Sequence, residues 1–203
     1  MHVRIPALAA ACLAALGLVV LTGSPNGRAD TSASLQSANT VPAQGSFTLI
    51  TANGIASTLD FNDIVLSGIS HGAAYSDSPV THVSVTLPVI AQNGSANFAA
   101  GGFQFTNRAN HRFVNCQTPV VDTQAHVLDC VLKDLKTVYM FSVTDPSPQP
   151  KSSNRSVTAI TKGLEVRVYS QQTADFLNAA LGTNAFSPSV LFATADLTVN
   201  TAR

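Results

Sequence analysis

Short apolar runs recur along most of the chain about every ten positions, separated by turn residues. The clearest is the segment His82–Ala91, in which Val83, Val85 and Leu87 alternate with polar residues as in a strand with one buried face. This spacing favours an antiparallel β-sandwich or barrel-like domain over alternating strands and helices. The runs predicted as strands are 45–51, 64–66, 82–91, 98–106, 111–115, 120–123, 127–132, 138–143, 164–169 and 190–199.

One helical pattern stands out near the C-terminus. Its apolar stripe at helical spacing consists of Phe176, Leu177, Ala180 and Leu181. Ser170 or Thr173 can cap the start, and Gly182 lies where a helix often ends in a left-handed residue. The pattern predicts one short helix over 173–181, whereas 55–61 fits either a short helix or an extended link.

The first thirty residues have the pattern of a secretory signal peptide. Arg4 supplies a positive start, an apolar run extends from Ile5 to Leu21, and the small-residue stretch 27–29 precedes Asp30. The alternative is an uncleaved membrane anchor, but the run of about seventeen residues is at the lower limit for a bilayer span. We therefore expect cleavage, no transmembrane segment afterwards, and a secreted or cell-envelope location.

This leader sets the expected domain organisation. Residues 1–29 are the predicted signal peptide, and 30–44, rich in Ser, Ala and Thr, are predicted to be a flexible segment. Residues 45–203 have the length of a single β-rich domain. Within it, the Pro- and Ser-rich stretch 145–156 predicts an exposed loop.

Charge is scarce and evenly spread. The 203 residues include 11 basic and 11 acidic side chains, and no basic cluster occurs. Nucleic-acid binding needs a positive patch facing the phosphates, so the sequence argues against it. Abundant Thr and Val with little charge is typical of extracellular β domains.

The cysteines indicate one disulfide. Cys12 lies in the leader, which leaves Cys116 and Cys130 in the mature chain. After export into an oxidising compartment, an even count predicts a bridge. The bridge would contribute on the order of 3 kcal/mol in the chain-entropy model. A metal-binding pair is the alternative, but two cysteines without a Cys-x-x-Cys motif are a poor ligand set.

Residues 68–72 (GISHG) match the G-x-S-x-G nucleophile elbow, with Ser70 as the candidate nucleophile of a hydrolase. The elbow requires a strand, a turn and then a helix. The residues that follow, 73–79, are too few and end in Pro79. The triad histidine should also come late in the chain, but the last one is His126. A Gly/Ser turn between strands is therefore the expected structure.

The remaining candidates for ligand chemistry are histidines and tyrosines. No His-x-His pair or similar metal motif occurs, although His111 and His126 could approach each other across paired strands. Surface positions are the simpler expectation for both. The tyrosines that could in principle bind haem iron are Tyr75, Tyr139 and Tyr169.

Parts of the chain resemble a known family. Residues 177–186 (LNAALGTNAF) and 191–195 (LFATA) resemble the closing helix, turn and strand of HtaA-type domains of secreted and cell-surface bacterial proteins. Residues 87–89 (LPV) and 101–107 (GGFQFTN) are similar to the part of related sequences that precedes a pair of β-hairpins. The resemblance extends over residues 45–200.

The resemblance implies a secreted β-rich domain. Better-known members of the family take part in haem acquisition and bind haem through a tyrosine supported by a histidine. This chain contains no Trp, and no segment matches the ligand-bearing motifs of the family, so the resemblance assigns no ligand residue. It also does not imply the Cys116–Cys130 pair.

The sequence thus predicts an exported, non-catalytic binding module of the envelope or extracellular space, with an unknown ligand and no metal site. The first alternative is a haem or small-ligand binding protein. The second is a serine hydrolase that uses Ser70.

Overall fold

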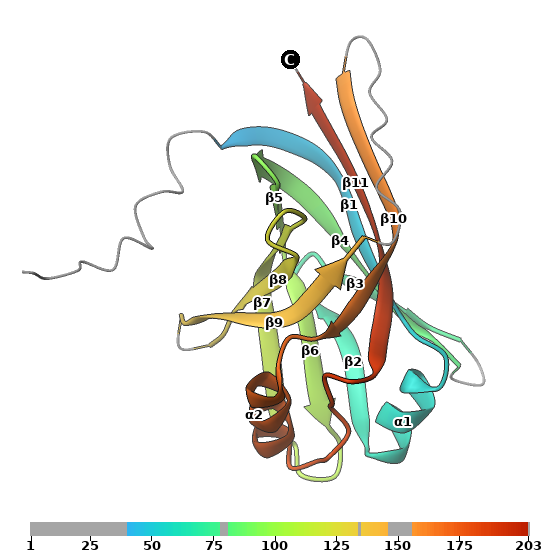
Figure 1. Cartoon of the computed structure of the whole chain (residues 1–203). Helices are drawn as coiled ribbons and strands as arrows, with labels where there is room; N and C mark the ends of the chain where they lie inside the picture. Colours follow the sequence, from blue (N-terminus) through green and yellow to red (C-terminus); the bar gives the residue numbers. More distant parts are fainter. Residues whose placement is uncertain (1–39, 78–80, 134, 146–155, 203) are drawn as a thin grey trace, which may run out of the picture. The chain divides into compact units, whose positions relative to one another are not determined.

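Antiparallel strands make up most of the fold (Figure 1). The structure is a computed structural model that describes residues 40–77, 81–133, 135–145 and 156–202. Its strands are β1 (Val41–Thr51), β2 (Ile64–Ile69), β3 (Ala73–Ser76), β4 (Val83–Asn93), β5 (Ala96–Ala99), β6 (Gly102–Asn107), β7 (Phe113–Asp122), β8 (Val127–Val131), β9 (Thr137–Thr144), β10 (Ser156–Val168) and β11 (Leu191–Ala202). The helices are α1 (Ile55–Phe61) and α2 (Gln171–Leu181).

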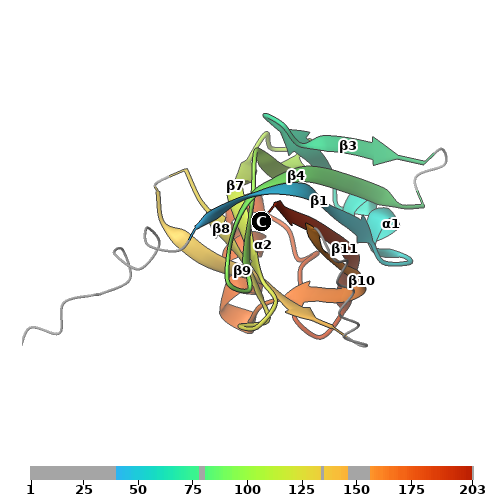
Figure 2. The ribbon, with the colours of Figure 1, turned by 90° about the horizontal axis from the view of Figure 1, so that it is seen from above.

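Eight of the strands close into a barrel. Their order is β7-β5-β4-β1-β11-β10-β9-β8, and β8 pairs with β7 to complete the ring. The strands β2 and β6 extend the sheet beyond β7, and β3 lies beside β4 (Figure 2). The prediction of a mainly antiparallel β fold with a short helix near the C-terminus is confirmed, in its barrel form.

Apolar side chains that share one face of the strands fill the core. Phe47 on β1 lies opposite Leu87 on β4 and Leu197 on β11, and all three are buried. A group of rings 5.1–6.3 Å apart continues this core, namely Phe103, Phe105, Phe141, Phe186 and Phe192. Burial of each such side chain stabilises the fold by about 1.5–3 kcal/mol, so this face fixes the register.

The turn between β2 and β3 packs against the bend between β5 and β6 at a corner made of glycines. The Gly72 amide donates a 3.0 Å hydrogen bond to the Ile69 carbonyl, which turns β2 into β3. Gly101, at φ +79°, makes the corresponding bend between β5 and β6. An added Cβ at Gly68 would overlap the Gly72 carbonyl, and one at Gly102 would overlap the Cys116 carbonyl. Backbone thus contacts backbone at this corner, which only glycine permits.

The helix α2 has the ends that its sequence predicts. The Ser170 hydroxyl accepts a hydrogen bond of 3.1 Å from the Thr173 amide, which identifies Ser170 as the cap. Gly182 has the left-handed φ of 68° at the other end. The segment 55–61, for which two structures were open, is the helix α1.

Several strand boundaries differ from the sequence pattern, among them that of β10, which begins at Ser156 and not at residue 164. The strand β1 begins at Val41, so residues 41–44, predicted to be flexible, pair with neighbouring strands. The predicted strand 98–106 is two strands, because Gly101 bends it. The sequence pattern predicts separate strands at 111–115 and 120–123. They instead contribute to the single strand β7, in which Thr118 forms a bulge with φ 39°.

Three predicted features fall wholly or largely on residues outside the described ranges. These are the signal peptide at 1–29, most of the flexible segment at 30–44, and the loop at 145–156. The short strand β3 was not predicted, because its four residues, Ala73–Ser76, are all exposed and show no alternation.

Gly101→Ala tests the packing at the glycine corner against a matched control. Gly54 has nearly the same φ, +82°, but an added Cβ there meets open space, whereas at Gly101 it would lie 2.7 Å from the His71 nitrogen. Gly54→Ala should cost about 1–2 kcal/mol for the left-handed backbone alone. Gly101→Ala should cost a further 1–3 kcal/mol or so from overpacking. Urea unfolding of both variants measures the difference, and equal losses would show that the corner is not tightly packed.

Candidate functional site

The helix α2 is held against the barrel at both of its ends. Near its start, the Thr173 hydroxyl donates to the Tyr139 carbonyl at 3.3 Å, which ties the helix to β9. At its end, the side-chain amides of Asn107 and Asn110 both donate to the Leu181 carbonyl at 2.9 Å. These bonds satisfy a carbonyl that the helix itself leaves without a partner. The helix is therefore fixed in place before any ligand arrives.

A cleft of about 610 Å³ lies between α2, the start of β7 and the turn after β8. We call it the helix cleft. Its lining consists of Phe113, Val114, Asn115, Leu132, Lys133, Phe176 and Ala180. Its volume falls within the range of about 300–1,000 Å³ typical of sites for small organic ligands.

Two aromatic rings and one ammonium group give the helix cleft its chemistry. Phe113 and Phe176 remain 47% and 40% exposed, whereas the five rings of the core group are buried. The Lys133 ammonium lies 6.0 Å from the centre of the Phe113 ring. Among the described residues that line the cleft there is no carboxylate. The cleft thus offers an apolar surface beside a positive charge.

Sequence patterns did not identify this site. Phe176 belongs to the apolar stripe of α2, and the helical spacing therefore predicts that it is part of the core. The structure instead buries Thr173, Ala174, Leu177 and Leu181, and leaves Phe176 facing the cleft. One signal in the sequence points to the site: the apolar stripe of this helix is wider than a single buried face requires.

The G-x-S-x-G segment does not have the structure of a nucleophile elbow. Ser70 lies in the turn between β2 and β3, so a strand follows it where the elbow requires a helix. Ser70 and His71 are both exposed. The glycines Gly68 and Gly72 instead serve the close backbone contacts of the corner. The segment is therefore a turn between strands, the structure expected for it.

The structure also separates the two histidines that were considered as a pair. His111 precedes β7 and His126 follows it, so they lie at opposite ends of a ten-residue strand. At about 3.3 Å per residue, such a strand is roughly 30 Å long. Within the described ranges, no group of three or more metal-ligating side chains occurs.

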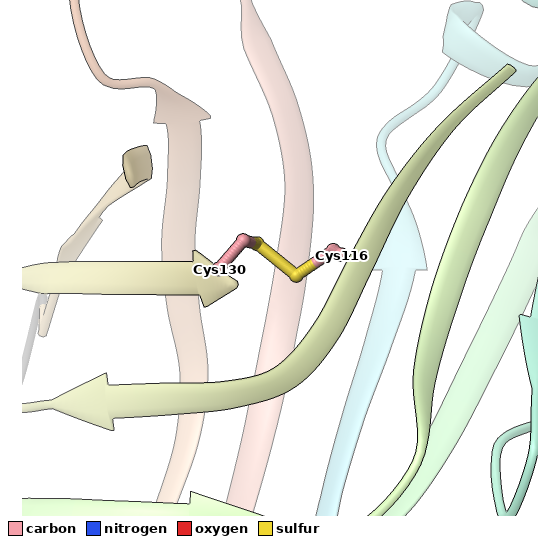
Figure 3. The surroundings of a disulfide bond; sticks show 2 residues. All are labelled: Cys116 and Cys130. Carbon is pink, nitrogen blue, oxygen red and sulfur yellow. A yellow bond between two sulfur atoms is a disulfide. The ribbon is translucent and has the colours of Figure 1, made fainter. Parts of the chain in front are cut away.

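Cys116 and Cys130 form a disulfide between β7 and β8 (Figure 3). Their Cα atoms lie 4.8 Å apart and both side chains are buried. The bond therefore joins the two strands whose pairing closes the barrel.

Two aspartates near this disulfide have shifted pKa values of opposite sign. Burial alone would raise the pKa of Asp122, but hydrogen bonds from Ala125, Ser95 and Gln124, together with the His126 charge, lower it below its usual range. Burial, and then the nearby Asp122 carboxylate, raise the pKa of Asp129 to about 6. The Asp129 Oδ1 atom is sealed from solvent and has no hydrogen-bond partner among the described residues.

Taken together, the fold and the cleft define a β-barrel module with an open, partly apolar surface site. No family model matches the chain, and no curated protein matches it. Among solved structures, it is similar to the crystal structure of the haem-binding protein HtaB from Corynebacterium glutamicum. That similarity has a TM-score of 0.47 and 11% sequence identity, and it covers 80% of this chain and 96% of that chain. The site and ligand of this chain therefore have to be argued from its own residues.

Asp129→Asn tests the shifted titration. Because the pKa of Asp129 is about 6 in the folded chain and near its ordinary 3.8 in the unfolded chain, ionisation opposes folding. Its favourable contribution is present below pH 3.8 and is lost as the pH rises through 6. The Tm difference between the variant and the unmodified protein should thus be small at pH 4 and positive at pH 7.5. Asp175→Asn, on the exposed side of α2, controls for the loss of one charge, and a difference independent of pH would contradict the assignment.

Proposed function

We propose that this chain is an exported, non-catalytic binding module that holds a small amphipathic anion in the helix cleft. The observation that carries the proposal is the pair of half-exposed rings, Phe113 and Phe176, beside the Lys133 ammonium. An apolar ligand body would cover the rings and remove them from water. At about 25 cal/mol per Å² of apolar area, this burial supplies most of the binding free energy.

The charge of the lining selects the sign of the ligand. Lys133 is the one ionisable residue among the seven described residues that line the helix cleft. Arg112, next to Phe113 in the chain, adds a second positive charge nearby and donates to the Ala179 carbonyl on α2. A carboxylate or sulfonate beside the apolar body would therefore be attracted, and a cationic ligand repelled.

The fixed position of α2 supports a ready-formed site. Ordering a mobile segment on binding costs free energy that reduces affinity. Here the hydrogen bonds at Thr173 and Leu181 hold the helix against the barrel without a ligand. Binding at the helix cleft can therefore use most of the apolar contact for affinity.

Export is part of the proposal and is supported by two features. The leader has the order of regions found in signal peptides. The Cys116–Cys130 disulfide is of the kind that persists in oxidising compartments. Among the described residues, neither helix is long and apolar enough to cross a membrane.

Haem is the alternative ligand implied by the HtaA-type resemblance, and the residues fit it poorly. Within the part of the chain that the structure describes, no Tyr, His, Cys or Met that could hold the iron lines the helix cleft. Tyr75 is exposed on β3, and the register places it diagonally across from His82 on one face of the β3–β4 hairpin. Both ring nitrogens of His82, however, already have partners, Asn53 at 2.8 Å and Thr81 at 3.2 Å. His82 is thus not free to support a tyrosine ligand.

Two matched fluorescent probes test the proposed site. 1-Anilinonaphthalene-8-sulfonate is an aromatic anion, and N-phenyl-1-naphthylamine has the same ring system without the charge. We expect the anion to bind at one saturable site. Lys133→Gln should weaken its binding about tenfold, the loss of roughly 1.4 kcal/mol, and leave the neutral probe nearly unaffected. Phe176→Ala should weaken both probes, because it removes apolar contact.

Phe61→Ala is the control for loss of an exposed ring, since Phe61 is 88% exposed on α1 and does not line the helix cleft. This variant should bind both probes as the unmodified protein does. If Phe61→Ala and Phe176→Ala weaken binding equally, the probes bind the surface at large and the proposed site is wrong.

A hemin titration separates the proposal from the haem alternative. Since both ring nitrogens of His82 have partners and cannot support Tyr75, we expect no saturable Soret band that depends on Tyr75. A saturable band that is lost in Tyr75→Phe and retained in Tyr139→Phe would replace the proposed ligand by haem.

A further inference from the structure

A second cavity, separate from the helix cleft, lies at the bulge in β7. The pairing of β7 with β8 shifts between Gln117 and Val120, and beside this irregularity lies a partly open pocket of about 210 Å³. We call it the bulge pocket. Its side chains are Phe98 on β5, Thr118 and Val120 on β7, Asp129 and Val131 on β8, and Thr137 on β9, next to the disulfide.

Of the described residues that line the bulge pocket, Asp129 is the one with an ionisable side chain. Its Oδ1 atom is sealed from water without a hydrogen bond among the described residues. The groups that face it from neighbouring strands do not compensate the charge. Asp122 on β7 is a second carboxylate, which adds repulsion, and Tyr139 lies opposite on β9. Half-burial of the Asp129 carboxylate without a compensating charge costs free energy, so pairing with a cation here would be favourable.

We propose that the bulge pocket binds a small alkylammonium ion, with the ammonium group paired to Asp129 and the alkyl chain against Phe98, Val120 and Val131. The volume equals about seven water molecules at roughly 30 Å³ each, which suits a ligand of four to six non-hydrogen atoms. The hydroxyls of Thr118 and Thr137 can accept hydrogen bonds from the ammonium protons.

An inorganic cation fits the same pocket less well. Ca²⁺ needs six to eight oxygen ligands, and Mg²⁺ needs a near-octahedral set. The bulge pocket offers one carboxylate and two hydroxyls among apolar walls. Those walls match an alkyl chain, which loses contact with water when it enters.

Nitrogen-15 NMR of the protein with n-butylammonium chloride and with 1-butanol tests this site. The two probes have the same chain and differ in charge. We expect butylammonium to cause saturable shifts of the Val120, Val131 and Thr137 amides in the millimolar range. Butanol should cause at most weak shifts at the same concentrations. Asp129→Asn should weaken butylammonium binding at least tenfold. Equal binding of both probes, or unchanged binding in Asp129→Asn, would overturn the proposal.

Two variants separate a lost site from a changed fold. Val131→Phe fills the bulge pocket but keeps Asp129, so it should also abolish binding. Asp175→Asn removes a carboxylate from α2 and should bind butylammonium normally. Nα-acetyl-lysine methylamide then distinguishes the source of the ammonium group. Binding as tight as that of butylammonium would indicate a lysine of a protein partner, and weaker binding would indicate a free amine. The helix cleft plays no part in these measurements, so their outcome does not depend on the anion site.

Discussion

The close contact of backbone with backbone at the glycine corner is the constraint on which the rest of the structure depends. At this corner β2 turns into β3, and β5 bends into β6. The strands β3 and β5 can therefore pair with β4, while β2 and β6 extend the sheet beyond β7. An added Cβ at Gly72 would overlap the Gly102 carbonyl, and one at Gly101 would lie 2.7 Å from the His71 nitrogen. A side chain at either glycine would therefore force the two bends apart.

The extension beyond the barrel is also what provides the helix cleft. Because β6 continues past the ring, its last residue, Asn107, can reach the end of α2. The turn that follows brings Asn110 to the same Leu181 carbonyl. The helix is thus fastened to a part of the sheet that the barrel alone would not possess. Beside this fastened helix, the rings of Phe113 and Phe176 remain partly uncovered and line the helix cleft.

Local patterns predicted the parts of this fold that depend on local physics. The alternation in 82–91 and the capped stripe at 173–181 each follow from one element burying one face, and both were found. Bends were harder. Gly101 and Thr118 redirect strands through contacts with distant residues, which no local spacing reveals. For the same reason the predicted strand 98–106 is two strands, and the predicted strands 111–115 and 120–123 contribute to one.

The candidate sites were beyond the sequence for a related reason. Phe176 looks like a core residue in its own helix, and only the position of β7 leaves it exposed. Asp129 looks like an ordinary polar residue between apolar ones, and only the bulge across from it creates the cavity. Conversely, the residues for which the sequence did suggest chemistry, Ser70, His111 and His126, lie in connections between strands. Strand pairing determines which residues surround them.

The disulfide bears on how this chain would be exported across a membrane. The bond fastens the pair of strands that closes the ring, and it forms only where thiols are oxidised. Before that, the reduced chain lacks this fastening and unfolds more readily. Under the proposed export, the chain would cross the membrane in its reduced and least stable form. It would become fully stable only after the disulfide forms outside, where it would bind its ligand.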